Sequence, residues 1–178
     1  RVPNLIYGYE EALGYCVNPD FVGDKDGVSA LTMFLELVAA LKDEGRSCWN
    51  VLDEIATEFG LYASDQVSVK FTDLSVVPQV MGSLRTNPPM SLGGLQVKAV
   101  HDLATGFEGL PPTDGVILML SGNDRITKAR VIVRPSGTEP KIKCYLEVVA
   151  TDKDLTQARR SAEQTLAQLA SDARPLLA

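Results

Sequence analysis

Residues 114–149 read DGVILMLSGNDRITKARVIVRPSGTEPKIKCYLEVV and contain three apolar segments separated by turns. The segment 116–120 is uninterrupted and apolar, and the segments 129–133 and 142–149 are rich in valine and isoleucine. Short apolar runs between turns that contain glycine predict neighbouring strands joined by hairpins. We therefore expect an antiparallel sheet here, and this stretch determines the fold class of the second part of the chain.

The flanking sequence predicts helices and further strands. Apolar residues at helical spacing predict helices over 29–45, 49–59 and 151–173, and a short helix that ends before Pro88. Thr151 and Asp152 are the expected N-terminal cap of the last helix. Alternating side chains predict strands over 66–71 and 95–100, and the run 5–7 predicts a buried strand that enters a long loop at Gly8. We expect a division near Ser64, with a helix-rich part before it and an α+β part after it.

Composition excludes several classes of protein. The 178 residues include 17 Lys and Arg against 23 Asp and Glu, a net charge of −6, so no cationic surplus is available for nonspecific nucleic-acid binding. No apolar run approaches the roughly 20 residues of a membrane helix, and no signal peptide is apparent. Three widely spaced cysteines and one histidine argue against a disulfide framework or a zinc site and favour a cytoplasmic location.

A polar turn follows the segment 129–133. It combines a guanidinium, hydroxyls and a glycine, at Arg134, Ser136, Gly137 and Thr138. A guanidinium matches phosphate oxygens, and successive backbone N–H groups in such a turn bind anions. Lys141 and Lys143 follow two residues apart, so in a strand they point to one face and add charge. The pattern predicts either a phosphate-binding loop or a polar hairpin turn with incidental charge.

The long loop before the first helix holds the second group of candidates. Glu10 and Glu11 are adjacent, so on an extended backbone one can bind a polyol while the other pairs with a cation. Lys25 stands between Asp24 and Asp26 just before the helix, where helix capping and negative charge are favoured. Each feature also fits an ordinary solvated surface, and these residues alone leave both interpretations open.

Three motifs together resemble the α-D-phosphohexomutase family, which contains phosphoglucomutases and phosphomannomutases. They are GYEEALGY at 8–15, DKDGVSA at 24–30 and RPSGTEPKIK at 134–143, in the family order. The resemblance implies the C-terminal portion of a four-domain enzyme, and the start at Arg1 fits either an internal position or a processed end. Residues 1–64 would be the C-terminal part of the third, mixed α/β sheet domain. Residues 65–178 would be the complete fourth domain, a TATA-binding-protein-like α+β unit.

The resemblance also implies roles for single residues. Arg134, Ser136, Gly137 and Thr138 look like the loop that holds the non-reacting phosphate of the sugar, and Lys143 would assist. Glu10 looks like the carboxylate that binds sugar hydroxyls, and Lys25 matches a lysine at the cleft edge. Ala12 replaces a serine that is frequent in the family, so Glu11 or Tyr15 is expected to replace that hydroxyl contact.

The implied enzyme interconverts sugar 1-phosphates and 6-phosphates through a phosphoserine and a sugar 1,6-bisphosphate, with Mg²⁺. The phosphoserine loop and the Asp-rich metal loop of the family are not found here, so we expect no catalytic residue, no metal ligand and no activity from these residues alone. Expected partners are a small phosphosugar and the missing N-terminal domains of the same chain, but neither nucleic acid nor membrane. A phosphopentomutase, which the EEALGY variant resembles, and a standalone phosphosugar-binding module remain alternatives.

Overall fold

The computed structural model describes residues 5–10, 13–137, 139–152 and 154–177, and it forms two compact units that divide between Glu54 and Ile55. The division expected near Ser64 falls instead within a strand, Leu61–Lys70, which pairs along its whole length inside the second unit. The physical reason is the ladder of backbone hydrogen bonds, which ties residues 61–64 to the sheet.

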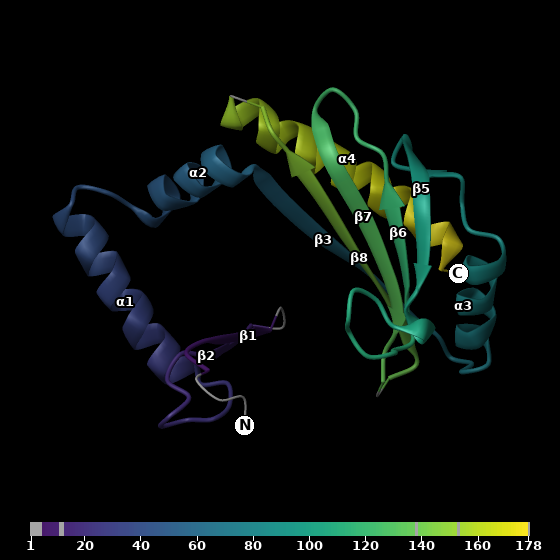
Figure 1. Cartoon of the computed structure of the whole chain (residues 1–178), viewed down its shortest axis with the longest axis horizontal. Helices are drawn as coiled ribbons and strands as arrows, with labels where there is room; N and C mark the ends of the chain where they lie inside the picture. Colours follow the sequence, from purple (N-terminus) through teal and green to yellow (C-terminus); the bar gives the residue numbers. More distant parts are fainter. Residues whose placement is uncertain (1–4, 11–12, 138, 153, 178) are drawn as a thin grey trace. The chain divides into compact units, whose positions relative to one another are not determined.

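The first unit contains a small hairpin and two helices. They are β1 (Gly8–Glu10), β2 (Gly14–Cys16), α1 (Gly27–Asp43) and α2 (Cys48–Phe59), the last of which crosses the division (Figure 1). Asp26 caps α1, because its carboxylate accepts hydrogen bonds from the N–H groups of Val28 and Ser29. The buried strand expected over 5–7 is wrong, since these residues are outside regular structure and exposed. The strand begins only at Gly8, and a hairpin whose two strands have three residues each offers too little surface to cover residues 5–7.

The second unit is a six-stranded antiparallel sheet with helices (Figure 1). Its strands are β3 (Leu61–Lys70), β4 (Ser91–Leu92), β5 (Leu95–Asp102), β6 (Val116–Leu120), β7 (Ile126–Pro135) and β8 (Lys141–Ala150). They lie in the order β3-β8-β7-β6-β5-β4, and the helices are α3 (Val76–Thr86), the 3-10 turn η1 (Leu103–Thr105) and α4 (Leu155–Leu176). The expected α+β class is confirmed, whereas the likeness to the TATA-binding protein stays a prediction.

Alternation along the strands separates a core face from a polar face. Along residues 141–148 of β8 the buried side chains are Ile142, Cys144, Leu146 and Val148, and the more exposed ones are Lys141, Lys143, Tyr145 and Glu147. The buried face packs against α3 and against apolar residues of α4 at helical spacing, Ala158, Ala162, Leu166, Leu169 and Ala173.

All three cysteines are free, and burial raises the pKa of Cys144 to about 12, so this thiol stays protonated at neutral pH.

The start of α4 differs from the expectation. The helix begins at Leu155, and the side chain of Asp154 accepts hydrogen bonds from the N–H groups of Thr156 and Gln157 at 2.8 and 3.4 Å. Thr151 and Asp152 are therefore not the cap, because β8 continues to Ala150 and the connection needs the following residues.

Within the described ranges, no helix combines the length and the apolar character needed to span a membrane.

The core assignment predicts that Leu146→Ala destabilises the sheet unit. Leu146 is fully buried, so truncation leaves a cavity that should lower the free energy of unfolding by about 2–5 kcal/mol. Urea unfolding followed by far-ultraviolet circular dichroism measures this change. Leu74→Ala is the matched control, because Leu74 is 68% exposed and its loss should cost no more than about 0.5 kcal/mol. Equal losses in the two variants would contradict the assignment.

Candidate functional site

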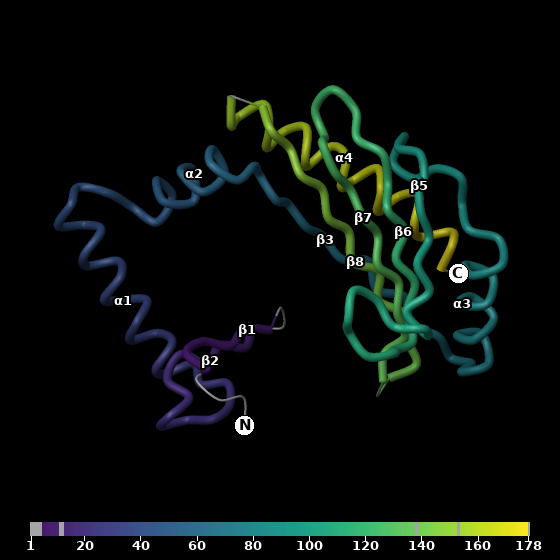
Figure 2. The backbone as a smooth tube through the Cα atoms, viewed as in Figure 1, coloured from purple at the N-terminus to yellow at the C-terminus, as the bar shows by residue number. Residues whose placement is uncertain are grey.

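The sequence-predicted phosphate loop lies between β7 and β8, at the end of the sheet that also carries the segment 103–115 (Figure 2). The backbone N–H of Ser136 donates to the carbonyl of Lys141 at 2.8 Å, and the N–H of Phe71 donates to the carbonyl of Pro140 at 2.7 Å. The turn is therefore tied both to β8 and to the residue that follows β3. Ser136 keeps its hydroxyl for a ligand but not its N–H, Gly137 is exposed, and Thr138 lies outside the described residues.

The register of β7 and β8 places Arg134 directly opposite Lys143 on the polar face. Like charges at directly opposite positions destabilise a sheet, so such a pair normally has a compensating anion. Along the same two strands, Arg130 stands opposite Glu147 and is compensated by it, with distances of 2.9 and 3.0 Å. Among the described residues, neither Arg134 nor Lys143 forms a salt bridge with a carboxylate. The two cationic residues therefore stand at opposite positions of the ladder without a salt bridge to any carboxylate that the structure describes.

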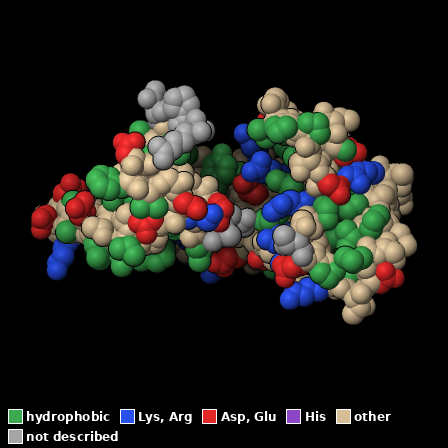
Figure 3. Space-filling view, turned by 90° about the horizontal axis from the view of Figure 1, so that it is seen from below, with side chains coloured by type: hydrophobic (Ala, Val, Ile, Leu, Met, Phe, Trp, Pro, Cys, Tyr) green, Lys and Arg blue, Asp and Glu red, His purple; other side chains and the backbone are tan. Residues whose placement is uncertain are grey.

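Two further lysines lie in the next row of the sheet. Lys70 of β3 stands opposite Lys141 of β8, and Lys141 forms an ion pair with Glu139 of the turn. The hydrogen bond and charge of Lys141 lower the pKa of Glu139, and the charges of Lys70 and Lys143 contribute less. Lys141 is thus engaged by a carboxylate of its own loop, whereas Lys143 faces Arg134. Figure 3 shows Lys and Arg side chains gathered at this end of the sheet unit.

The segment 103–115 forms a wall beside Arg134. A Cβ on Gly115 would lie in van der Waals contact with the Cβ of Arg134, at 3.6 Å. It would also lie 2.9 Å from Leu103 Cδ1 and 3.3 Å from the carbonyl oxygen of Val133, so a larger residue would displace the Leu103 side chain. Arg85 of α3 holds both ends of the segment, through Asp102 at 3.1 Å and through Asp114. The hydrogen bond that Arg85 donates to Asp114, followed by the one that it donates to Asp102, raises the pKa of Arg85. This wall is therefore anchored by these ion pairs and by backbone hydrogen bonds from Leu103 to Gly115 and from Thr113 to Leu103.

In the first unit, the structure brings Glu10 and Lys25 together. The Lys25 Nζ lies 3.8 Å from Glu10 Oε2 and 3.4 Å from Asp24 Oδ1. Both side chains pass over Gly14, where a Cβ would overlap Glu10 Cγ and Lys25 Cδ. The N–H of Asp26 donates to the carbonyl of Tyr15 at 2.8 Å, which fixes the backbone next to Lys25. Glu11 lies outside the described residues, so its expected part in this group stays a prediction.

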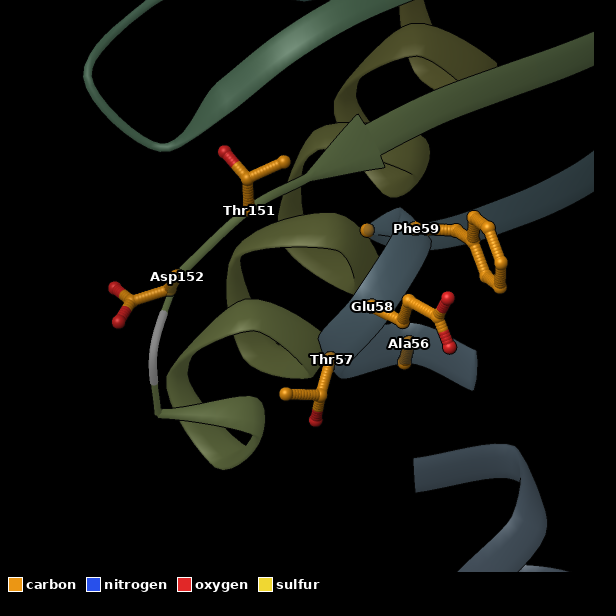
Figure 4. Close-up of a pocket in the computed structure, with 7 residues that line it drawn as sticks. Ala56, Thr57, Glu58, Phe59, Thr151 and Asp152 are labelled. Carbon is orange, nitrogen blue, oxygen red and sulfur yellow. The ribbon is translucent and has the colours of Figure 1, made fainter. Parts of the chain in front are cut away.

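A shallow hollow lies at the opposite end of β8 (Figure 4). It is lined by residues 56–60 at the end of α2 and by Thr151 and Asp152. The ten residues of β8 span about 30 Å, so the hollow is separate from Arg134.

In the described part of the chain, no three His, Cys, Asp or Glu side chains gather closely enough to hold a metal ion. The described residues therefore do not fit a Mg²⁺ site.

Sequence reasoning missed Lys70 and Tyr145, which stand beside the predicted residues on the polar face. Lys70 pairs across the sheet with Lys141, and the hydroxyl of Tyr145 accepts a hydrogen bond from Arg134 at 3.1 Å. The alternating pattern of 142–149 was a usable signal for Tyr145, because it places residues 141, 143 and 145 on one face. For Lys70 no such signal existed, since the pairing of β3 with β8 joins distant segments.

Comparison with known proteins identifies the family of the β7–β8 region. The family description "Phosphoglucomutase/phosphomannomutase, C-terminal domain" matches residues 121–165. A probable phosphomannomutase of Haemophilus influenzae is 39% identical over 178 residues, which are 99% of this chain and 34% of that protein. A phosphoglucomutase of Staphylococcus epidermidis is 32% identical over 158 residues, which cover 82% of this chain and 28% of that protein. A phosphopentomutase of Mus musculus is 33% identical over 157 residues, which cover 82% of this chain and 25% of that protein. The chain thus spans about a third or less of these relatives.

The ion pair in the turn predicts an acid-shifted titration of Glu139. Lys141 stabilises the carboxylate, so we expect a pKa below the ordinary value of 4.5, measurable from the carboxyl ¹³C shift. Because the pKa is lowered, the ion pair is complete at neutral pH and is lost only as the pH falls through the shifted value. Lys141→Gln should raise the pKa, and Lys141→Arg should keep it low. If Glu139 had the same pKa in the original chain, in Lys141→Gln and in Lys141→Arg, the ion pair would not form.

Proposed function

The chain carries a C-terminal domain of the phosphoglucomutase/phosphomannomutase family, and on this basis we propose that it supplies phosphate- and sugar-binding residues to a sugar-phosphate mutase. The observation that carries the proposal is the uncompensated pair of Arg134 and Lys143, inside the segment that matches the family. A phosphate monoester with up to two negative charges suits two adjacent cations, and the guanidinium fork matches two of its oxygens.

Each candidate residue then has a chemical role. Arg134 and Lys143 bind the phosphate that does not react, the hydroxyl of Ser136 adds a donor, and Gly137 leaves the backbone accessible. Thr138 is assigned to the same loop from its place in the motif. In the first unit, Glu10 accepts hydrogen bonds from sugar hydroxyls, and Lys25 holds its carboxylate in place. Glu11 is assigned to the sugar loop from the sequence alone.

The complete reaction consists of two phosphoryl transfers. A phosphoserine upstream of this chain gives its phosphate to the sugar phosphate and forms a sugar 1,6-bisphosphate, which turns over and returns its other phosphate to the serine. Mg²⁺, which would neutralise charge during transfer, belongs to the upstream residues as well. The present residues must hold either phosphate in turn, and a pair of cations that forms no salt bridge with a described carboxylate suits repeated binding and release. Closure over the ligand would exclude water from the phosphoenzyme.

Exposed apolar side chains of the first unit support further segments as its partners. In α1 the side chains of Leu31, Met33, Phe34, Leu35 and Leu37 are each at least half exposed. A helix with apolar residues on all sides is normally buried. The relatives are about three or more times longer than the matched region, which leaves enough chain to cover α1. We propose that the upstream domains of a longer protein do so.

The sugar defines a second candidate function. Phosphopentomutases of Mus musculus and Pongo abelii are 33% and 32% identical to this chain, close to the values for the phosphoglucomutases. Together with Ala12 in the sugar loop, they support a pentose phosphate as an alternative substrate.

A standalone binding module would use the same phosphate residues without turnover. The mass of the protein in cell extract, detected with an antibody to this chain, distinguishes that module near 19.2 kDa from a whole mutase.

The 178-residue chain by itself should bind phosphosugars weakly and convert none of them. No phosphoryl donor is expected within it, so glucose 1-phosphate, mannose 1-phosphate and ribose 1-phosphate should remain unchanged in a ³¹P NMR assay with Mg²⁺ and bisphosphate. The full-length protein serves as the positive control. Turnover by the chain alone would overturn the assignment of the catalytic serine to an upstream segment.

In the full-length protein, Arg134→Ala should lower kcat/KM by about 30- to 1000-fold, equivalent to about 2–4 kcal/mol of transition-state stabilisation. Arg130→Ala is the matched control, because Arg130 lies on the same face of the same strand but already pairs with Glu147. We expect it to change kcat/KM by less than about threefold. An unchanged value for Arg134→Ala, or equal losses in both variants, would remove Arg134 from the phosphate site.

A further inference from the structure

Tyr145 lies next to the Arg134–Lys143 pair on the polar face of the sheet. It follows Lys143 by two residues on β8, so both side chains point to the same side, and its direct partner on β7 is Ile132. Tyr145 is therefore the diagonal neighbour of Arg134, a separation that long and aromatic side chains bridge. Its neighbours Cys144 and Leu146 are fully buried in the core, which fixes the strand that carries it.

Two contacts join Tyr145 to Arg134. The Arg134 Nη2 donates a hydrogen bond to the Tyr145 hydroxyl at 3.1 Å, and the guanidinium carbon lies 5.6 Å from the centroid of the ring. The second distance is within the range of a cation–π interaction. The phenol thus satisfies one of the five N–H donors of the guanidinium and leaves the others for a ligand.

These contacts restrict a side chain that would otherwise be mobile. An exposed arginine has many rotamers, and ordering them on binding reduces affinity. Repulsion from Lys143 would also push the guanidinium away from the row where an anion binds. Contact with Tyr145 holds Arg134 beside Lys143 without supplying a negative charge, so the anion site stays electrostatically open. A carboxylate at position 145 would instead neutralise it.

We propose that Tyr145 is a positioning residue, which orients the Arg134 guanidinium for a phosphate group before the ligand arrives. The inference rests on the proposed function, because it assumes that Arg134 binds phosphate. Tyr145 acts on the anion through Arg134, and its effect should disappear when the guanidinium is removed.

Titration of the 178-residue chain with inorganic phosphate tests this role, with the backbone ¹⁵N shift of Lys143 as the readout. Tyr145→Phe keeps the ring and removes the hydrogen bond, so the dissociation constant should rise by about three- to tenfold. Tyr145→Leu also removes the cation–π contact and should bind more weakly still. Glucose 6-phosphate in the same titrations shows whether the effect holds for a phosphate monoester. Thermal melting of each variant verifies that the sheet is folded.

Arg134→Ala, alone and combined with Tyr145→Phe, completes a double-mutant cycle. We expect Tyr145→Phe to have no further effect once Arg134 is alanine. The heteronuclear ¹⁵N NOE of Arg134 Nε gives a second readout without ligand, and it should fall in Tyr145→Leu. If Arg134→Ala binds phosphate like the original chain, the proposed function fails. If Arg134→Ala weakens binding while both Tyr145 variants match the original chain in affinity and in NOE, only the role of Tyr145 is overturned.

Discussion

The antiparallel pairing of β7 with β8 is the interaction on which the rest of the structure depends. It sets the register in which Val133 pairs with Cys144 on the core face and Arg134 pairs with Lys143 on the polar face. Because side chains alternate along a strand, a slip by one residue would exchange the two faces. The same ladder would then bury the cations and expose the apolar residues that contact α4. Core formation and the placement of the cationic pair are therefore consequences of one register.

The energies of the two faces explain why the fold tolerates a repulsive pair. Like charges at opposite positions cost roughly 0.2–1 kcal/mol, and water and salt screen the exposed members further. Each large apolar side chain buried on the core face contributes roughly 1.5–3 kcal/mol, and β8 alone places Ile142, Leu146 and Val148 there. The core determines the register, and the polar face follows it. Arg134 and Lys143 repel each other and so do not stabilise the fold. Such locally unfavourable residues are typical of a binding site.

Two kinds of anchoring hold the loops around this site. The turn after β7 is fixed by the backbone, through Ser136 to Lys141 and through Phe71 to Pro140. The segment 103–115 is closed by backbone hydrogen bonds from Leu103 to Gly115 and from Thr113 to Leu103, and Arg85 adds side-chain ion pairs to Asp102 and Asp114. The backbone contacts do not respond to moderate changes of pH or salt, whereas partly exposed ion pairs weaken as salt rises. The wall beside Arg134 therefore combines backbone contacts that resist salt with ion pairs that salt weakens.

Much of the local structure could be predicted from the sequence, because periodicity and capping are properties of neighbouring residues. The strand 116–120 and the starts of α1 and α2 agree with prediction to within two residues, and the RPSGTEPKIK motif identified the turn. The errors lie where long-range contacts determine the structure. β3 extends back to Leu61 because β8 offers it a partner, and the run 5–7 has no strand partner among the described residues. The sequence by itself determined the helices, most strands, the fold class and the residue types of the candidate site. Only the tertiary structure decided that Arg134 faces Lys143, that Tyr145 holds its guanidinium and that Lys70 joins the same face. These contacts depend on strand order and register, which arise from the packing of the whole sheet and not from any short stretch of sequence.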